Sequence, residues 1–296
     1  MKSFPRKFWR YIWRPPWRVF TMLMLLAGMV VIAYWIWTPG TRITDGRYNL
    51  NANGIWIQHG WLGDDAWFER NRRDKSRFRS AEQVNQLAEQ LSAYGIKYVY
   101  PHLCPCGHDG HIAAVDHDQT ERFLDNIGDI EVLPRVGGVL DVHCFPAVPR
   151  WRQRFISSTL ELLEAHPRLT GVHINIEPLP SDNPHFLTLL EELRAAMPAG
   201  KILSVAAYPP PSLWHPMKEV HWDESYYRQV SMYADQLAVM MYDTAIRFPK
   251  IYQNLMADWT REMLAWSPVY RDRVLDSHLQ LVESDILIYL QIGSFA

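Results

Sequence analysis

The sequence predicts an α/β fold of the (β/α)8 TIM-barrel type, incomplete at strands seven and eight and preceded by one transmembrane helix. Short apolar strands alternate with amphipathic helical segments, no hairpin signal joins consecutive strands, and six strands fall between residues 54 and 243. Such alternation is typical of a parallel sheet with crossover helices, and the spacing suits a barrel. An open doubly wound sheet is the alternative, but it would need a glycine-rich phosphate turn after the first strand, which the sequence lacks.

The N-terminal segment predicts a single-pass anchor. Residues 19–37 carry no charge and are long enough to span a hydrocarbon core as a helix. The tail at residues 1–18 holds six basic residues and no acid, which places it in the cytoplasm and the body of the protein in the periplasm or another extracytoplasmic space. A cleaved signal peptide is the alternative, although bulky aromatic residues replace the small-residue cleavage pattern. Residues 38–50 form a linker, and residues 51–296 form the barrel domain.

The elements of the barrel follow in order from local patterns of apolar residues, caps and turns. We predict strands at residues 55–59, 96–102, 131–136, 171–177, 202–207, 236–242 and 285–292. We predict helices at residues 80–95, 118–126, 149–166, 184–197, 223–234 and 250–266. The first helix begins with a capping-box pattern at Ser80 and Gln83, and the arginine-rich residues 61–79 before it are expected to form a loop. Only 53 residues follow Asp243, too few for two complete barrel units of roughly 30 residues each together with the helix at 250–266.

The overall composition limits the classes of function. The chain has 296 residues, 48% of them hydrophobic and 21% charged, which is ordinary for a globular protein. Its net charge of −2 argues against a nucleic-acid partner, which would favour a basic face. Three cysteines are too few for a disulfide framework. We expect no cofactor and no resident metal ion.

The strand at residues 171–177 carries the candidate chemistry. Successive side chains of a strand point to opposite faces, so His173, Asn175 and Glu177 share one face while the other face is apolar. Pro178 cannot donate to a sheet ladder and should end the strand. Glu177 is therefore expected at the carboxyl end of a strand, where parallel α/β folds place their active sites.

Three motifs resemble glycoside hydrolase family 18, the chitinase-like barrels. The acidic D-G-x-D-x-D-x-E pattern of the family's fourth strand corresponds to the eight residues from Thr170 to Glu177. The S-x-G-G end of its third strand corresponds to residues 135–138, which read Arg-Val-Gly-Gly. The M-x-Y-D end of its sixth strand corresponds to residues 240–243, which read Met-Met-Tyr-Asp. The order and spacing of the three agree with that barrel over about residues 50 to 266.

The resemblance implies substrate-assisted hydrolysis of a glycan that carries a 2-acetamido sugar, a named exception to the two-carboxylate scheme. Glu177 matches the general acid, and Tyr242 matches the group that hydrogen-bonds the acetamido carbonyl. Asn175 takes the place of the aspartate that orients the acetamido nitrogen, and Asp243 matches a sugar-binding residue. An Asn-Glu pair in this role also resembles the N-acetylglucosaminidases of family 85. We further expect His173, Trp56, Tyr208 and His102, which lie on or after strands, to contact the substrate.

Departures from the family pattern leave two hypotheses open. Thr170, His173 and Asn175 replace all three aspartates of the acidic pattern, and the tail is short. The chain is therefore either an anchored O-glycosyl hydrolase of a polymer of N-acetyl sugars or a barrel of the same ancestry that binds a glycan or a protein without cleaving it.

The loop after the second predicted strand allows three interpretations. It contains two cysteines and three histidines within residues 102–111. It forms a substrate-contacting loop, a structural loop or a metal site, although its C-x-C-x-H spacing matches no common structural zinc motif. Cys144 is a possible disulfide partner for either Cys104 or Cys106 in an oxidising compartment.

Overall fold

A computed structural model describes residues 16–39, 52–213, 215–241, 244–266 and 287–291. The chain forms two compact units, one of Met1–Asp45 with Ile246–Ala257, and one of Gly46–Ala245 with Asp258–Ala296. The domain boundaries predicted after residues 18, 37 and 50 stay predictions.

The second unit is built on parallel strands. They are β1 (Asn53–Ile57), β2 (Ile96–Pro101), β3 (Glu131–Val132), β4 (Arg135–Val139), β5 (Gly171–Glu177), β6 (Ile202–Ala207), β7 (Gln236–Met240) and β8 (Leu287–Gln291). One sheet has the order β1-β2-β3 and the other the order β4-β5-β6-β7-β8, and every ladder is parallel. This confirms the α/β class, the parallel sheet and all seven predicted strands.

The barrel is incomplete, as predicted. β3 and β4 are two halves of one predicted strand, interrupted at Leu133 and Pro134, so the described residues supply seven staves rather than eight. A parallel bridge between His102 and Arg135 carries the pairing of β2 past the interruption. β8 pairs with β7 and lies against β1 on its other side, although no ladder between β1 and β8 occurs in the described part of the chain.

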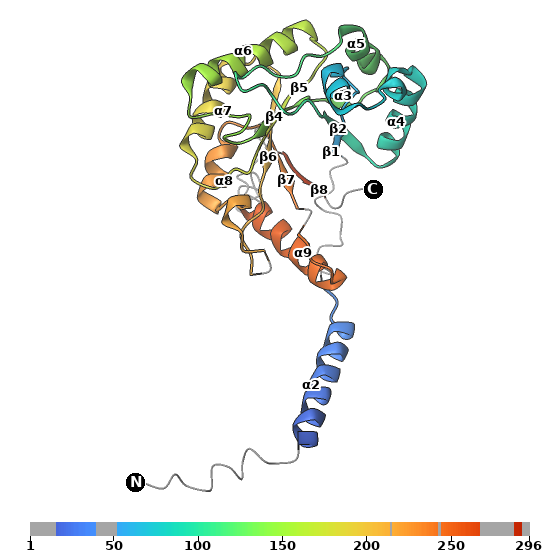
Figure 1. Ribbon diagram of the computed structural model, residues 1–296, viewed down its shortest axis with the longest axis vertical. Coiled ribbons are helices and arrows are strands. Elements are labelled where there is room, and N and C mark those ends of the chain that lie inside the picture. The colour runs from blue at the N-terminus through green and yellow to red at the C-terminus, as the bar shows by residue number, and fades with distance from the viewer. Residues whose placement is uncertain (1–15, 40–51, 214, 242–243, 267–286, 292–296) are drawn as a thin grey trace, which may run out of the picture. The chain divides into compact units, whose positions relative to one another are not determined.

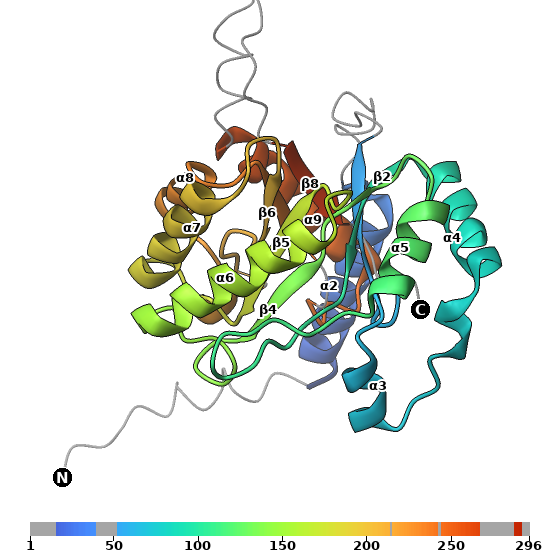
Figure 2. The ribbon, with the colours of Figure 1, turned by 90° about the horizontal axis from the view of Figure 1, so that it is seen from above.

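Helices cover the outer surface of the strands (Figures 1 and 2). They are α4 (Ala81–Ala93), α5 (His117–Asn126), α6 (Pro149–Ala165), α7 (Pro184–Ala196) and α8 (Glu224–Ser231), with a short 3-10 helix at Lys218–Val220. A further helix, α9 (Pro249–Trp266), has residues in both units. Asp116, Asn183 and Asp223 cap α5, α7 and α8 by accepting hydrogen bonds from backbone N–H groups of the first turn.

The prediction of a loop at residues 61–79 is wrong. It contains α3 (Asp65–Asn71) and a 3-10 helix (Ser76–Arg79). Phe68 and Phe78 are buried against each other, and Asp65 pairs with both Lys75 and Arg79. Contacts between residues 10 to 14 positions apart therefore order a segment whose local pattern is polar.

The prediction of a capping box at the start of α4 is also wrong. Ser80 is the N-cap residue, but its side chain makes no capping hydrogen bond. Its backbone carbonyl accepts from the Val84 N–H, so the helix begins at the predicted place without that cap.

The first unit contains α2 (Pro16–Ile36). Its residues Arg18–Ile36 form the one helix in the described part of the chain that is long and apolar enough to cross a membrane, and none of that helix is buried. Lys250 donates through Nζ to the carbonyl oxygens of Tyr34, Trp35 and Trp37 at 2.9, 2.5 and 2.7 Å. These carbonyls lie at the C-terminal end of α2, where a helix lacks internal donors and favours a cation.

The close approach of β4 to β5 requires a glycine at position 137. Gly137 has φ +131° and pairs in register with Asn175, and a Cβ added to it would lie 2.1 Å from the Asn175 carbonyl oxygen. We expect Gly137→Ala to lower the free energy of unfolding by ~2 kcal/mol more than Gly200→Ala, because strain and overpacking each cost ~1–3 kcal/mol. Gly200 is the matched control, since its φ is also positive (+82°) but nothing lies within 4 Å of an added Cβ.

Chemical unfolding of the two variants and the parent protein measures this difference. Equal destabilisation by the two substitutions would show that the backbone dihedral, and not the contact with β5, determines the requirement for glycine.

Candidate active site

Glu177 ends β5 and is the most exposed polar side chain of that strand. Its side chain is 37% exposed, whereas Asn175 is only 3% exposed. Asn175 Nδ2 donates a hydrogen bond of 2.6 Å to Glu177 Oε1. The predicted end of the strand at Pro178 and the shared face of these two residues are both present, so the amide and the carboxyl group form a contact pair at the carboxyl end of the strand.

Arg135 completes this pair from the neighbouring strand. Its Nη2 lies 3.2 Å from the same Oε1 atom of Glu177, and its side chain is 18% exposed. Oε1 therefore receives two donors, and within the described part of the chain Oε2 receives none. Sequence analysis missed this contact because Arg135 lies 42 positions from Glu177 and stands where the family pattern has a serine.

Two buried polar atoms at this position have no hydrogen-bond partner among the described residues, namely Asn175 Oδ1 and Arg135 Nε. A buried acceptor left unpaired costs ~1–3 kcal/mol, so such an atom requires an explanation. Asn175 therefore has its amide nitrogen directed at Glu177 and a free amide oxygen available to an N–H donor.

His173 lies two residues before Asn175 on the same face and is fully buried. Trp56 Nε1 donates to His173 Nε2 at 2.9 Å, and because an indole can only donate, Nε2 must be the acceptor. The ring proton therefore resides on Nδ1, which donates to Ser204 Oγ at 2.9 Å. Burial, and then the charge of Arg135, lower the pKa of His173 well below its ordinary value, so the imidazole is neutral.

The contacts of His173 extend to side chains of other strands inside the barrel. The Tyr100 ring stacks on His173 with centroids 4.2 Å apart, and its hydroxyl group donates to Gln236 Oε1 at 3.3 Å. Trp56, Tyr100, His173, Ser204 and Gln236 come from β1, β2, β5, β6 and β7, respectively. A polar-aromatic layer of five strands therefore supports Asn175 and Glu177.

A row of rings follows the ends of β1 and β2. His59 stacks between Trp67 and His102, with centroids 4.0 Å from each. The buried Asp64 pairs with His59 and accepts from the Gly60 N–H at 2.7 Å. Sequence analysis identified His102 but not His59 or Asp64, whose association depends on the fold of residues 61–79.

His102 is held as a neutral ring. The Cys104 N–H donates to its Nδ1 at 3.1 Å, which leaves the proton on Nε2. Burial, followed by the charges of Arg135 and His59, lowers the pKa of His102 to about 3.

The remaining predicted site residues differ in how far the structure describes them. Tyr208 follows β6, is buried, and packs edge-on against Trp222 at 6.0 Å. Trp56 is half-buried within β1. Tyr242 and Asp243 lie outside the described residues, and β7, which leads toward them, is described to Met240.

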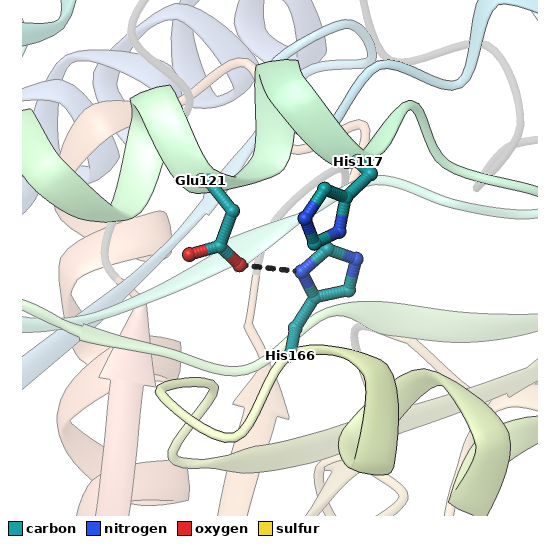
Figure 3. Close-up of side chains that lie close together, drawn as sticks. All are labelled: His117, Glu121 and His166. Carbon is teal, nitrogen blue, oxygen red and sulfur yellow. Dashed lines mark hydrogen bonds and ion pairs between the residues drawn. The ribbon is translucent and has the colours of Figure 1, made fainter.

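The loop after β2 brings Cys106 to Cys144. Their Sγ atoms are 3.5 Å apart, both are free and buried thiols, and Cys104 instead faces the Arg135 carbonyl oxygen. His111 pairs with Asp109 at 2.8 Å. In the described part of the chain, the one group of three metal-type ligands lies elsewhere, at His117, Glu121 and His166 (Figure 3).

Comparison with known proteins connects this geometry to a family. The family model described as glycosyl hydrolases family 18 matches residues 86–289, which is 204 of the 296 residues. The match spans β4, β5, β6 and β7 and therefore includes Arg135, Asn175 and Glu177. A comparison with the curated proteins finds no match.

Several solved structures resemble parts of the chain. The spore cortex-lytic enzyme SleL of Bacillus megaterium QM B1551 shares 13% identity with a TM-score of 0.48, over 73% of this chain and 48% of that one. SleL of Bacillus cereus shares 16% identity with a TM-score of 0.44, over 65% and 42%. A chitinase from Bacteroides thetaiotaomicron shares 16% identity with a TM-score of 0.42, over 66% and 55%. The chain spans about half of the length of these structures.

The neutral state of His173 predicts how stability depends on pH. In the unfolded chain a histidine binds a proton below about pH 6.5, whereas folded His173 does not, so lowering the pH favours unfolding. We expect the free energy of unfolding to fall as the pH is lowered from 7 to 5, with a slope of up to ~1.4 kcal/mol per pH unit from this residue.

Chemical unfolding at several pH values measures the slope. His173→Gln should reduce it, while His185→Ala, a change at an exposed histidine on α7, should leave it unchanged. An identical slope in His173→Gln and the parent protein would contradict the assignment of a buried neutral imidazole.

Proposed function

Because this chain belongs to glycosyl hydrolase family 18, we propose that it hydrolyses a glycan built from N-acetylhexosamine. The observation that carries the proposal is the pair at the carboxyl end of β5: a partly exposed Glu177 beside the unpartnered, buried amide oxygen of Asn175. A carboxyl group can give a proton to a glycosidic oxygen, and an amide oxygen can hold the N–H of an acetamido group.

The reaction is substrate-assisted in this proposal. Glu177 donates its proton to the leaving oxygen as the bond from the anomeric carbon to that oxygen breaks. The acetamido carbonyl oxygen of the same sugar forms the new bond to the anomeric carbon, so no enzyme nucleophile is required. Water then attacks the anomeric carbon as the bond from that carbon to the acetamido oxygen breaks, and the water gives a proton to Glu177, which restores both the acetamido group and the acid.

The contacts of Glu177 indicate which of its oxygens does this work. Asn175 and Arg135 both donate to Oε1, which fixes the carboxyl plane, so Oε2 is the oxygen that carries and delivers the proton. Asn175 Oδ1 accepts from the acetamido N–H, which directs the acetamido carbonyl toward the anomeric carbon. We assign Tyr242 to a hydrogen bond with that carbonyl and Asp243 to the sugar hydroxyls.

Of the other predicted residues, we assign two to the support of the site and two to contact with the substrate. His173 is buried with both ring nitrogens bonded, so we assign it to positioning Asn175 from below rather than to direct contact. Trp56 shares this supporting layer. His102 presents an Nε2–H that can donate to a sugar hydroxyl, and Tyr208 contributes an aromatic wall after β6.

A specific observation also favours the second function, a barrel that binds glycan without cleaving it. The Arg135 guanidinium pairs with Glu177 at a position where the family pattern has a serine. Asn175, in place of a carboxylate, also leaves the positive charge of the cyclic intermediate without a counter-charge from that position.

Turnover by the full-length chain distinguishes the two functions. We expect release of reducing ends from N-acetylglucosamine polymers, and loss of that activity by at least ~10²-fold in Glu177→Gln, because a positioned general acid contributes about 10²–10⁴. Glu192→Gln is the matched control, since Glu192 is a half-exposed glutamate on α7 that pairs with Arg152. Binding of the same polymers without turnover would establish the second function and exclude the first.

Asn175→Ala tests how the acetamido group is held. We expect kcat to fall ~10²-fold or more with a smaller change in KM, because the amide orients the group that attacks in the transition state. A rise in KM with kcat unchanged would assign Asn175 to ground-state binding alone.

We further propose that α2 anchors the protein, with the basic tail in the cytoplasm and the barrel on the far side. The uncharged helix and the basic residues before it support this orientation. The intact mass of protein extracted from membranes by detergent should include residues 1–37, and protease added to the far side should degrade the barrel. A mature N-terminus beyond residue 37 would instead identify a cleaved signal peptide.

A further inference from the structure

A second group of ligand-type side chains lies among the outer helices (Figure 3). His117 and Glu121 are four residues apart on α5, so both project from one face of that helix. His166 is the C-cap residue of α6, and its ring faces the same point. One ligand atom from each of the three residues lies within 4.8 Å of the others.

The three side chains differ in exposure. His166 is only 2% exposed, Glu121 is half-buried and His117 is exposed. Glu121 Oε1 lies 2.7 Å from His166 Nδ1, and the two imidazole rings stack with centroids 5.0 Å apart. The group is therefore closed on the side of His166 and open to solvent on the side of His117.

The charges around Glu121 favour a cation at its Oε1. Arg168 donates to the other oxygen, Oε2, at 2.6 Å, and Asp125 pairs with Arg168 at 2.7 Å. The two carboxylates and one guanidinium sum to −1.

We propose that His117, Glu121 and His166 form a binding site for a zinc ion. Two imidazoles and one carboxylate are a ligand set that zinc uses with a water molecule in the fourth position. Arg168 would act as the outer partner that fixes the carboxylate, a role that metal-bound carboxylates commonly require. The proposal uses no residue of the Glu177 site and does not depend on glycan hydrolysis.

The rearrangement required is small. Ligands at ~2.1 Å from a tetrahedral zinc ion lie ~3.4 Å apart, so the present separation closes by rotation of the exposed His117 and the half-buried Glu121. A neutral His166 with its proton on Nε2 offers Nδ1 as the ligand in place of the present hydrogen bond to Glu121.

The site would join two segments of the barrel wall. α5 precedes β3, and His166 lies five residues before Gly171, the first residue of β5. A zinc ion would therefore fix the start of the strand that carries Asn175 and Glu177. Its effect is expected on the stability of the fold, because metal that binds only the native state stabilises that state.

Titration of the full-length, detergent-purified chain with zinc chloride tests the site. We expect one zinc ion per chain in competition with a chromophoric chelator, and a thermal unfolding midpoint that rises with zinc. His117→Ala should weaken zinc binding at least ~10-fold and abolish the rise, and Glu121→Gln should do the same. Because His117 is exposed, its removal should leave the unfolding midpoint without zinc unchanged.

His111→Ala is the matched control. His111 forms a similar pair with Asp109 at 2.8 Å, but no third ligand joins that pair in the described part of the chain, so this variant should bind zinc as the parent protein does. Absence of saturable binding, or an unchanged affinity in His117→Ala, would overturn the proposal. Equal loss in His111→Ala and His117→Ala would overturn it as well.

Discussion

Burial of the polar face of β5 depends on hydrogen bonds that side chains of other strands supply. His173 would be costly to bury as an isolated ring, but Trp56 donates to one nitrogen and Ser204 accepts from the other. Tyr100 stacks on the ring and is itself bonded to Gln236. These contacts fix the backbone that carries Asn175, two residues further along β5. Asn175 in turn holds the Glu177 carboxyl group through a hydrogen bond of 2.6 Å. The geometry of the candidate acid is therefore set inside the barrel.

The contacts above this layer explain how a site without the family's aspartates can retain an ordered glutamate. In the family pattern the carboxylates lie on one strand, whereas here the charge opposite Glu177 comes from the adjacent strand, through Arg135. Both donors use Oε1, so this oxygen is held in place, and among the described residues Oε2 receives no donor. Burial, and then the charge of the same guanidinium, lower the pKa of His173, which keeps that ring neutral and able to accept from Trp56. The arginine that stands at position 135, in place of the family's serine, therefore pairs with Glu177 and also affects the pKa of the buried His173.

Local patterns are sufficient to predict most elements of this fold but not their long-range contacts. β5 is predictable because its apolar and polar residues alternate and Pro178 ends it, and α7 is predictable from the Asn183 cap and Pro184. The helix at Asp65–Asn71 is not, because its order comes from buried phenylalanines and from cations 10 and 14 positions away. Asn175 and Glu177 could be paired from strand periodicity alone. Arg135 could not, since the register of β4 against β5 places it opposite His173, and only its long side chain brings the guanidinium to Glu177.

The rings of the interior layer also fill the space between the strands. In the described part of the chain, the ring centroid of Trp56 lies 5.8 Å from that of Tyr100 and 5.6 Å from that of His173. A filled interior transmits a change at one strand to the next, because closely packed side chains have no free volume in which to relax. The histidine at position 173, where the family pattern has an aspartate, is part of this packing, since its aromatic ring fills space that a carboxylate would leave to water.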